Sequence, residues 1–189
     1  MKSKLVYVVP GWSEGSWHLR RLRRHLPQIG YRLTQSPKNA DIIIAHSAGA
    51  YSLPESPATL ILVLNPPYWP GRPIITRVWQ NIILDLPKEV RLWGAKRLLA
   101  IRVQNTINVL RRPVWHIKLW AALGGQLLSD NRGRNIIVVR NNQDAFSTPE
   151  LKDYCAKLGV RYVEMDGLHE DIWFNPRPYL ELIEKHYGR

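Results

Sequence analysis

A run of branched apolar residues that leads directly into a serine flanked by small residues constrains this chain most. The run Ile42-Ile43-Ile44 is followed by Ala45-His46-Ser47-Ala48-Gly49. A short, continuous, β-branched run of this kind predicts a buried strand. Small residues around the serine permit a tight turn in which a helix begins directly after a strand. The segment therefore predicts a strand–turn–helix unit with Ser47 exposed at the turn, although a serine that only caps a helix would give the same local pattern.

The other apolar runs of the chain predict the rest of a mostly parallel sheet. They are short, continuous and separated by segments with helical spacing, which is typical of strands covered by helices on both faces. The strands are expected over Lys4–Val9, Tyr31–Thr34, Asp41–Ala45, Leu60–Leu64, Ile136–Val139 and Val160–Val163. Helices are expected over Gly15–Leu26, from Thr148 to Leu158 and from about Pro176 onward. Pro54, seven residues after Ser47, predicts an unusually short helix behind the serine.

Residues 66–134 differ from the rest of the chain. Strand signals stop there, and three stretches have helical spacing: Val78 to Leu86, Leu92 to Leu110, and Val114 to Leu128. In the second stretch, Leu99, Val103, Thr106 and Leu110 share one predicted helix face with Leu92 and Ala95. We therefore expect an α/β core formed by residues 1–65 and 135–189, interrupted by a helical insert at 66–134.

The insert also carries most of the positive charge. The whole chain has a net charge of +12, and residues 66–134 contain 12 basic and 3 acidic residues and five of the eight tryptophans. Basic residues interleaved with tryptophan suit an anionic membrane surface. Nucleic acid is a less favoured partner, because no nucleic-acid-binding motif is present. An ordinary solvated basic face with tryptophans packed beneath it stays an equal alternative.

Length and composition limit the other possibilities. A chain of 189 residues that is 45% hydrophobic and 22% charged suits one globular domain. Cys155 is the single cysteine and cannot form an internal disulfide, which favours a reducing cytoplasm. No apolar stretch is long enough for a spanning helix, so the expected location is cytoplasmic, with peripheral membrane association open. No residue spacing predicts a metal site or a cofactor.

Two later residues could complete a site with Ser47. Asp144 follows the strand expected at 136–139, and His169 follows the one expected at 160–163. Because parallel strands end at the same edge of a sheet, these side chains can meet the serine there. A carboxylate can orient a histidine, and a neutral histidine can act as a general base. Taken singly, Asp144 could be a loop carboxylate and His169 a surface histidine without a role.

This order of elements resembles the α/β-hydrolase superfamily, and in particular the small serine hydrolases of the retinoblastoma-binding-protein-9 type. The resemblance covers 1–65 and 135–189 and implies a Ser47–Asp144–His169 triad. It also implies an oxyanion hole formed by the backbone N–H groups of Ala48 and Trp12, with Ser13 as an alternative to Trp12. The insert occupies the place of a lid. The implied function is hydrolysis of a carboxylic ester, such as a lipid or acyl ester, through an acyl-enzyme. The alternative is an inactive protein of this fold that uses the insert to bind a lipid, a protein or a nucleic acid.

Overall fold

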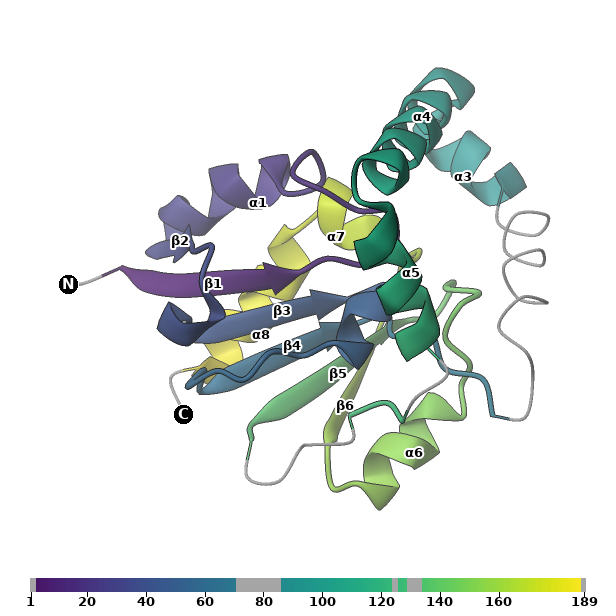
Figure 1. Cartoon of the computed structure of the whole chain (residues 1–189). Coiled ribbons are helices and arrows are strands. Elements are labelled where there is room, and N and C mark those ends of the chain that lie inside the picture. Colours follow the sequence, from purple (N-terminus) through teal and green to yellow (C-terminus); the bar gives the residue numbers. More distant parts are fainter. Residues whose placement is uncertain (1–2, 71–85, 124–125, 129–133, 188–189) are drawn as a thin grey trace.

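The computed structural model contains a six-stranded sheet in which all the strands are parallel (Figure 1). The spatial order is β2-β1-β3-β4-β5-β6, formed by β1 Lys4–Val9, β2 Tyr31–Leu33, β3 Ile42–His46, β4 Leu60–Leu64, β5 Ile136–Asn141 and β6 Arg161–Met165. The structure describes residues 3–70, 86–123, 126–128 and 134–187, without the side chains of Leu92 and Trp93. All six expected strands form, which confirms the prediction of a mostly parallel α/β fold.

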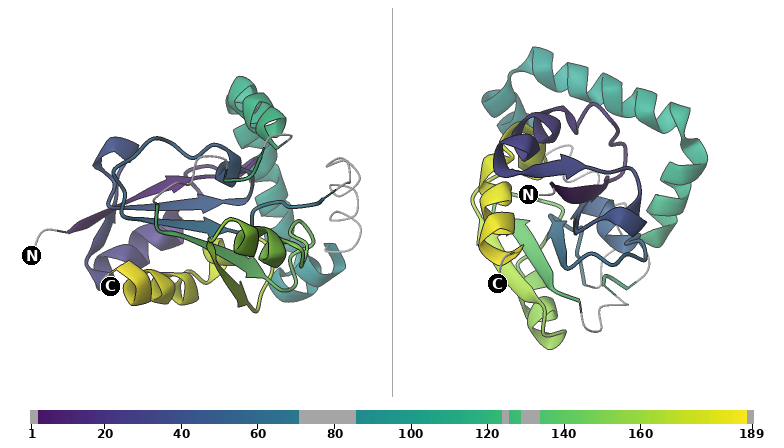
Figure 2. Two further views of the ribbon diagram at one scale, coloured as in Figure 1. Left: turned by 90° about the horizontal axis from the view of Figure 1, so that it is seen from below. Right: turned by 90° about the vertical axis from the view of Figure 1, so that its left-hand side faces the viewer.

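Helices cover both faces of the sheet. The first face packs against α1 Arg20–His25, α7 Asp171–Phe174 and α8 Arg177–Tyr187. The second face packs against the 3-10 helix η3 Ser47–Tyr51 and against α6 Leu151–Lys157. Figure 2 shows α1 and α8 together on one side of the strands. Both faces are apolar because successive side chains of a strand point to opposite faces, and β3 and β4 are buried throughout.

The strand order creates a crevice at the carboxyl edge. The chain passes from β1 to β2 on one side and then returns to β3 on the other side of β1. The loops that follow β1 and β3 therefore diverge, and such a reversal is where open α/β sheets place their sites. Ser47 follows β3 directly, so the fold places it at this crevice.

The expected helices form with different boundaries. The helix expected at Gly15–Leu26 is reduced to α1 and a 3-10 turn over Leu26–Ile29, and a second 3-10 turn covers Pro37–Asn39. Behind Ser47 only the short η3 forms, as Pro54 predicts. The described part of the insert contains α3 Leu86–Trp93, α4 Ala95–Arg111 and α5 Pro113–Ala122. The helix expected over 78–86 lies almost entirely outside the described residues, so the division into core and insert stays a prediction.

The described helices of the insert lie at the carboxyl end of the sheet (Figure 1). Helix α5 packs on η3, because Leu119 and Leu123 contact Ala48 in a small apolar cluster. None of the helices in the described ranges is both long and apolar enough to cross a membrane.

Candidate active site

Ser47 sits in a strained turn at the end of β3. Its φ angle is 52°, in the left-handed region that side chains other than glycine rarely adopt. The turn also brings η3 close to the end of β1, since a Cβ atom on Gly49 would lie 2.6 Å from the carbonyl oxygen of Val9. Glycine is therefore required at position 49. The first small position tolerates a methyl group, because Ala45 still belongs to β3 and packs in the apolar core.

The structure brings together the three side chains that the sequence singles out. The Nε2 atom of His169 lies 2.9 Å from Ser47 Oγ, and its Nδ1 atom lies 3.0 Å from Asp144 Oδ1. All three residues are largely buried, so the expectation that Ser47 is exposed at the turn is wrong: its side chain opens only onto the cavity beside it. The Nδ1 group is close to the carboxylate but is not aligned for a hydrogen bond, and such contacts often tighten only when substrate binds. Asp144 Oδ1 also accepts the N–H of Phe146, which fixes the carboxylate.

The loop after β1 lies against Ser47. A Cβ atom on Gly11 would lie 2.8 Å from Ser47 Cβ, so only glycine allows this approach. The N–H of Gly11 donates to Glu14 Oε2, and the N–H of Ser13 donates to Nδ1 of His116 at 3.2 Å. Within the described part of the chain, the N–H of Trp12 has no such partner. Of the two alternative donors in this loop, Trp12 is therefore the one that stays available to a ligand.

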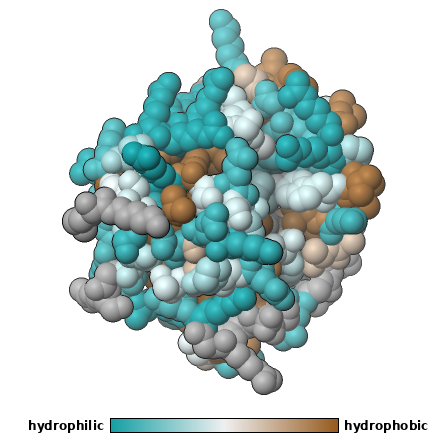
Figure 3. Space-filling model, turned by 60° about the vertical axis from the view of Figure 1, so that its left-hand side comes forward, coloured by the Kyte–Doolittle hydropathy of each residue, from teal (hydrophilic) through white to brown (hydrophobic). Residues whose placement is uncertain are grey.

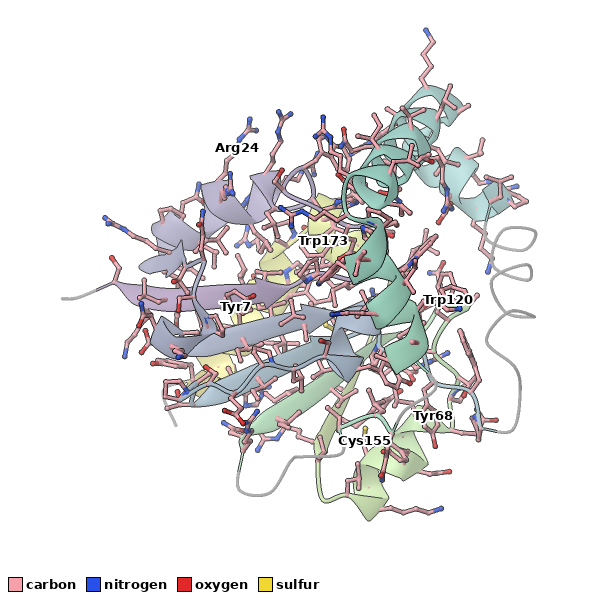
Figure 4. All side chains as sticks on the ribbon, in the orientation of Figure 1. Tyr7, Arg24, Tyr68, Trp120, Cys155 and Trp173 are labelled. Atoms are coloured by element: carbon pink, nitrogen blue, oxygen red, sulfur yellow. The ribbon has the colours of Figure 1, made fainter. Side chains whose placement is uncertain are left out.

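A buried ion pair lies beneath this loop. Glu14 Oε1 lies 2.5 Å from His46 Nδ1 and also accepts the indole N–H of Trp173 at 3.0 Å. Burial alone would lower the pKa of His46, but the charge of Glu14 and the hydrogen bond to it outweigh burial and raise this pKa to about 9. Burial conversely would raise the pKa of Glu14, and the positive charge of His46 lowers it instead. The pair is therefore ionised at neutral pH. Figure 4 shows Trp173 in α7, near the carboxyl end of β1.

Two side chains hold the backbone of His169. Its carbonyl oxygen accepts a hydrogen bond from His46 Nε2 at 2.8 Å and another from Asn65 Nδ2 at 2.9 Å. Asn65 follows β4, and its Oδ1 atom accepts the N–H of Asn141 at the end of β5. Because His46 ends β3, residues at the ends of three neighbouring strands fix the histidine loop.

A cavity of about 140 Å³ opens beside Ser47. Its apolar wall is formed by Trp12, Trp120, Leu123 and Phe146. Its polar lining includes Asn105 and Glu170, each of which has a buried side-chain oxygen that makes no hydrogen bond to any described residue. Burial, followed by the charge of Glu14, raises the pKa of Glu170. The cavity therefore offers an apolar wall together with polar groups that the described residues leave unpaired, which suits a ligand with both apolar and polar parts.

Sequence reasoning missed the supporting residues. The sequence assigns no role to His46, which directly precedes Ser47, to His116 in the third helical stretch of the insert, or to Glu14 and Asn65. Glu14 stands three residues after Gly11, a spacing at which a carboxylate can accept the backbone N–H of a turn. This spacing is the one feature of the sequence that points to a role for Glu14. Nothing in the sequence pairs Glu14 with His46, because that contact depends on the adjacency of β1 and β3.

Metal-ligating side chains do not cluster among the described residues. No group of three or more histidine, cysteine, aspartate or glutamate side chains with suitable geometry occurs among them. Two of the three acidic residues around His169 have other contacts, since Asp171 accepts the N–H of Leu168 and Asp166 accepts a hydrogen bond from the side-chain amide of Gln143.

Solved structures of other proteins share this fold. The chain superposes on MGS-M2, an α/β-hydrolase enzyme from a Medee basin deep-sea metagenome library, with a TM-score of 0.69 and 13% identity over 100% of this chain and 90% of that one. It superposes on the esterase RhEst1 from Rhodococcus sp. ECU1013 with a TM-score of 0.62 and 12% identity over 98% and 90% of the two chains. This chain has the α/β-hydrolase fold.

The enol-lactonase from Burkholderia xenovorans LB400 is a third similar structure, with a TM-score of 0.59 and 12% identity over 100% of this chain and 93% of that one. No protein-family model matches the chain, and no curated protein sequence does. At these identities the likeness shows the α/β-hydrolase fold alone. The resemblance to the retinoblastoma-binding-protein-9 type stays a prediction.

Proposed function

We propose that this protein is a serine hydrolase that cleaves a carboxylic ester through an acyl-enzyme. The observation that carries the proposal is the line of contacts from Ser47 Oγ to His169 Nε2 and from His169 Nδ1 to Asp144, at 2.9 Å and 3.0 Å. This is the geometry of an activated nucleophile, in which a serine in a strained turn contacts a histidine and the histidine contacts a buried carboxylate. The solved esterases and hydrolases of the same fold support the same class of reaction.

Each side chain has a defined role in the proposed reaction. His169 Nε2 accepts the proton of Ser47 as Oγ attacks the carbonyl carbon of the ester. Asp144 keeps Nδ1 protonated and stabilises the imidazolium that forms. His169 then protonates the leaving alcohol, and water, activated by the same histidine, hydrolyses the acyl-enzyme and regenerates Ser47.

The oxyanion of the tetrahedral intermediate needs two fixed donors. We assign them to the backbone N–H groups of Ala48 and Trp12. Ala48 directly follows the nucleophile, and the loop that carries Trp12 is held against Ser47 by Gly11 and Glu14. His116 supports this assignment, because burial lowers its pKa and its Nδ1 atom, as a neutral acceptor, occupies the N–H of Ser13.

A fluorophosphonate probe tests the nucleophile, because it reacts with activated serines. We expect the folded wild-type protein to be labelled and Ser47→Ala to be unlabelled. Ser52→Ala is the matched control at an exposed serine and should be labelled as the wild type is. His169→Ala should slow labelling by a factor of about 10³ or more, and Asp144→Asn by about 10² to 10⁴.

The same experiment separates the two functional classes. A folded wild type that neither reacts with the probe nor hydrolyses any ester of a series of increasing acyl length would overturn the proposal. The protein would then be a binding protein that keeps the hydrolase fold. Full activity of Asp144→Asn would show only that the acid is assigned wrongly.

A further inference from the structure

Helix α4 exposes an apolar face to solvent. Leu99, Val103 and Leu110 are 66%, 51% and 74% exposed, and their spacing places them on one side of the helix. Leu98 and Ile101 are buried on the opposite side. The apolar stripe expected in this segment therefore lies on the outside of the molecule, although the helix is amphipathic and already buries its other side.

Helix α5 continues this feature. Val114 and Ile117 are 64% and 68% exposed and are three residues apart, so they also share one side of their helix. Their neighbours His116 and Leu119 point inward and are buried. We call Leu99, Val103, Leu110, Val114 and Ile117 together the outer α4–α5 face. Five large exposed aliphatic side chains on two successive helices are unusual on a protein that has no partner for them.

The surroundings of this face are basic. Residues 86–123 contain eight basic residues and one acidic residue, Glu89. Glu89 is buried and pairs with Arg102 at 2.7 Å, so it does not offset the exposed charges. Lys96, Arg111 and Lys118 are exposed beside the apolar positions. Figure 3 shows apolar surface among hydrophilic side chains along the edge where Figure 2 draws α4 and α5.

The outer α4–α5 face borders the candidate active site through two tryptophans. Trp120 follows Ile117 by one helical turn, is 37% exposed and lines the cavity beside Ser47. Its ring packs edge-to-face against Trp12, which is 41% exposed and lines the same cavity, with 5.7 Å between the ring centroids. Figure 4 labels Trp120 beside α5, beyond the carboxyl ends of the strands. Tryptophan in this half-exposed state suits a membrane interface.

We propose that the outer α4–α5 face docks on an anionic membrane surface. Aliphatic side chains would enter the region between the headgroups and the acyl chains, while the neighbouring lysines and arginines contact anionic headgroups. Nucleic acid would neutralise the exposed lysines and arginines but leave the aliphatic side chains of the face without a role. A second copy of the chain would cover the aliphatic side chains but bring two clusters of positive charge together. The membrane accounts for both features, and it places the mouth of the cavity next to the lipid.

Vesicle co-sedimentation at low salt tests this docking. We expect the wild type to bind vesicles of phosphatidylcholine and phosphatidylglycerol in equal parts, and to bind phosphatidylcholine alone at least about tenfold more weakly. The double variant Leu110→Gln/Ile117→Gln should lower binding by about tenfold or more. Arg111→Gln/Lys118→Gln should lower it by about fivefold per residue and weaken its salt dependence. Leu158→Gln is the matched control, because Leu158 is an exposed leucine at the end of α6, and it should bind as the wild type does.

Four results would overturn the proposal. The first two are a wild type that does not sediment with anionic vesicles, and a Leu110→Gln/Ile117→Gln variant that binds them as the wild type does. The third is a wild-type dimer in size-exclusion chromatography that Leu110→Gln/Ile117→Gln converts to a monomer. The fourth is tight binding of duplex DNA or RNA that Leu110→Gln/Ile117→Gln leaves unaffected. The labelling test at Ser47 is independent of these results. Vesicle binding without labelling of Ser47 would support membrane docking and contradict the proposed hydrolase activity. Labelling without vesicle binding would support the hydrolase activity and contradict membrane docking.

Discussion

Glu14 accepts three N–H groups from three separate parts of the chain. They belong to the backbone of Gly11 and to the side chains of His46 and Trp173. Because the loop of Gly11 presents the proposed oxyanion donor Trp12, and His46 holds the backbone of His169, one carboxylate positions both sides of the site. Glu14 does not contact the reacting atoms in this scheme, so it is a positioning residue.

The variant Glu14→Gln tests this role at the residue scale. An amide has one acceptor oxygen and adds two N–H donors where three donors already converge, so at least one contact becomes unfavourable. We expect kcat for an ester to fall by about tenfold to a hundredfold and the free energy of unfolding to fall by about 2 to 4 kcal/mol. Steady-state kinetics and urea denaturation measure the two effects.

Glu181→Gln is the matched control, because Glu181 is an exposed carboxylate on α8. It should change neither kcat nor stability measurably. If Glu14→Gln kept both the wild-type kcat and the wild-type stability, the buried pair would have no positioning role. A loss of stability with unchanged kcat would make its role purely structural.

At the scale of elements, the fit of η3 against β1 depends on Gly49. A Cβ atom there would meet the backbone oxygens of Val9 and Pro10 at 2.6 Å and 2.7 Å. Neither oxygen can rotate away as a side chain could, so Gly49→Ala must displace the end of β1 and the loop that follows it. We expect a loss of about 1 to 3 kcal/mol of stability together with loss of probe labelling at Ser47.

Ala45→Gly provides the comparison at the other small position of the turn. Ala45 lies in the core without strain. Removing its methyl group should lower the free energy of unfolding by about 1 kcal/mol and leave labelling of Ser47 intact. Thermal unfolding and probe labelling of the two variants give the contrast. Equal labelling in Gly49→Ala and Ala45→Gly would show that the close approach to β1 does not shape the site.

The elements also show what the sequence can and cannot reveal. The six strands and the positions of Ser47, Asp144 and His169 at strand ends are predictable, because buried parallel strands are continuous apolar runs. The Glu14–His46 pair is not predictable, because it forms only through the adjacency of two strands. The side of α4 that is buried is not predictable either, since Leu98 and Leu99 are both leucines and only tertiary packing decides between them.

At the scale of the whole molecule, the buried ion pair makes stability depend on pH. The folded pKa of His46, at about 9, lies above its ordinary value of 6.5. Its stabilising contribution is therefore complete below pH 6.5 and is lost as pH rises through 9. The folded pKa of Glu14 lies below its ordinary value of 4.5, so its contribution is complete above pH 4.5 and is lost as pH falls through the folded pKa. Together the two groups stabilise the fold most between pH 4.5 and 6.5.

We therefore expect the free energy of unfolding to fall as pH rises from 6.5 to 9, by an amount on the order of a few kcal/mol. Urea denaturation of the wild type and of His46→Asn over this range measures the effect, and the variant should be less stable at pH 6.5 and lose most of the slope. Glu170→Gln is measured in the same experiment, because burial and then the charge of Glu14 raise the pKa of Glu170, which can therefore add to the slope. A slope that persists unchanged in His46→Asn would place the titrating group elsewhere. The contact between Glu14 and His46, which joins the loop of Trp12 to the backbone of His169, would then be a neutral hydrogen bond and not an ion pair.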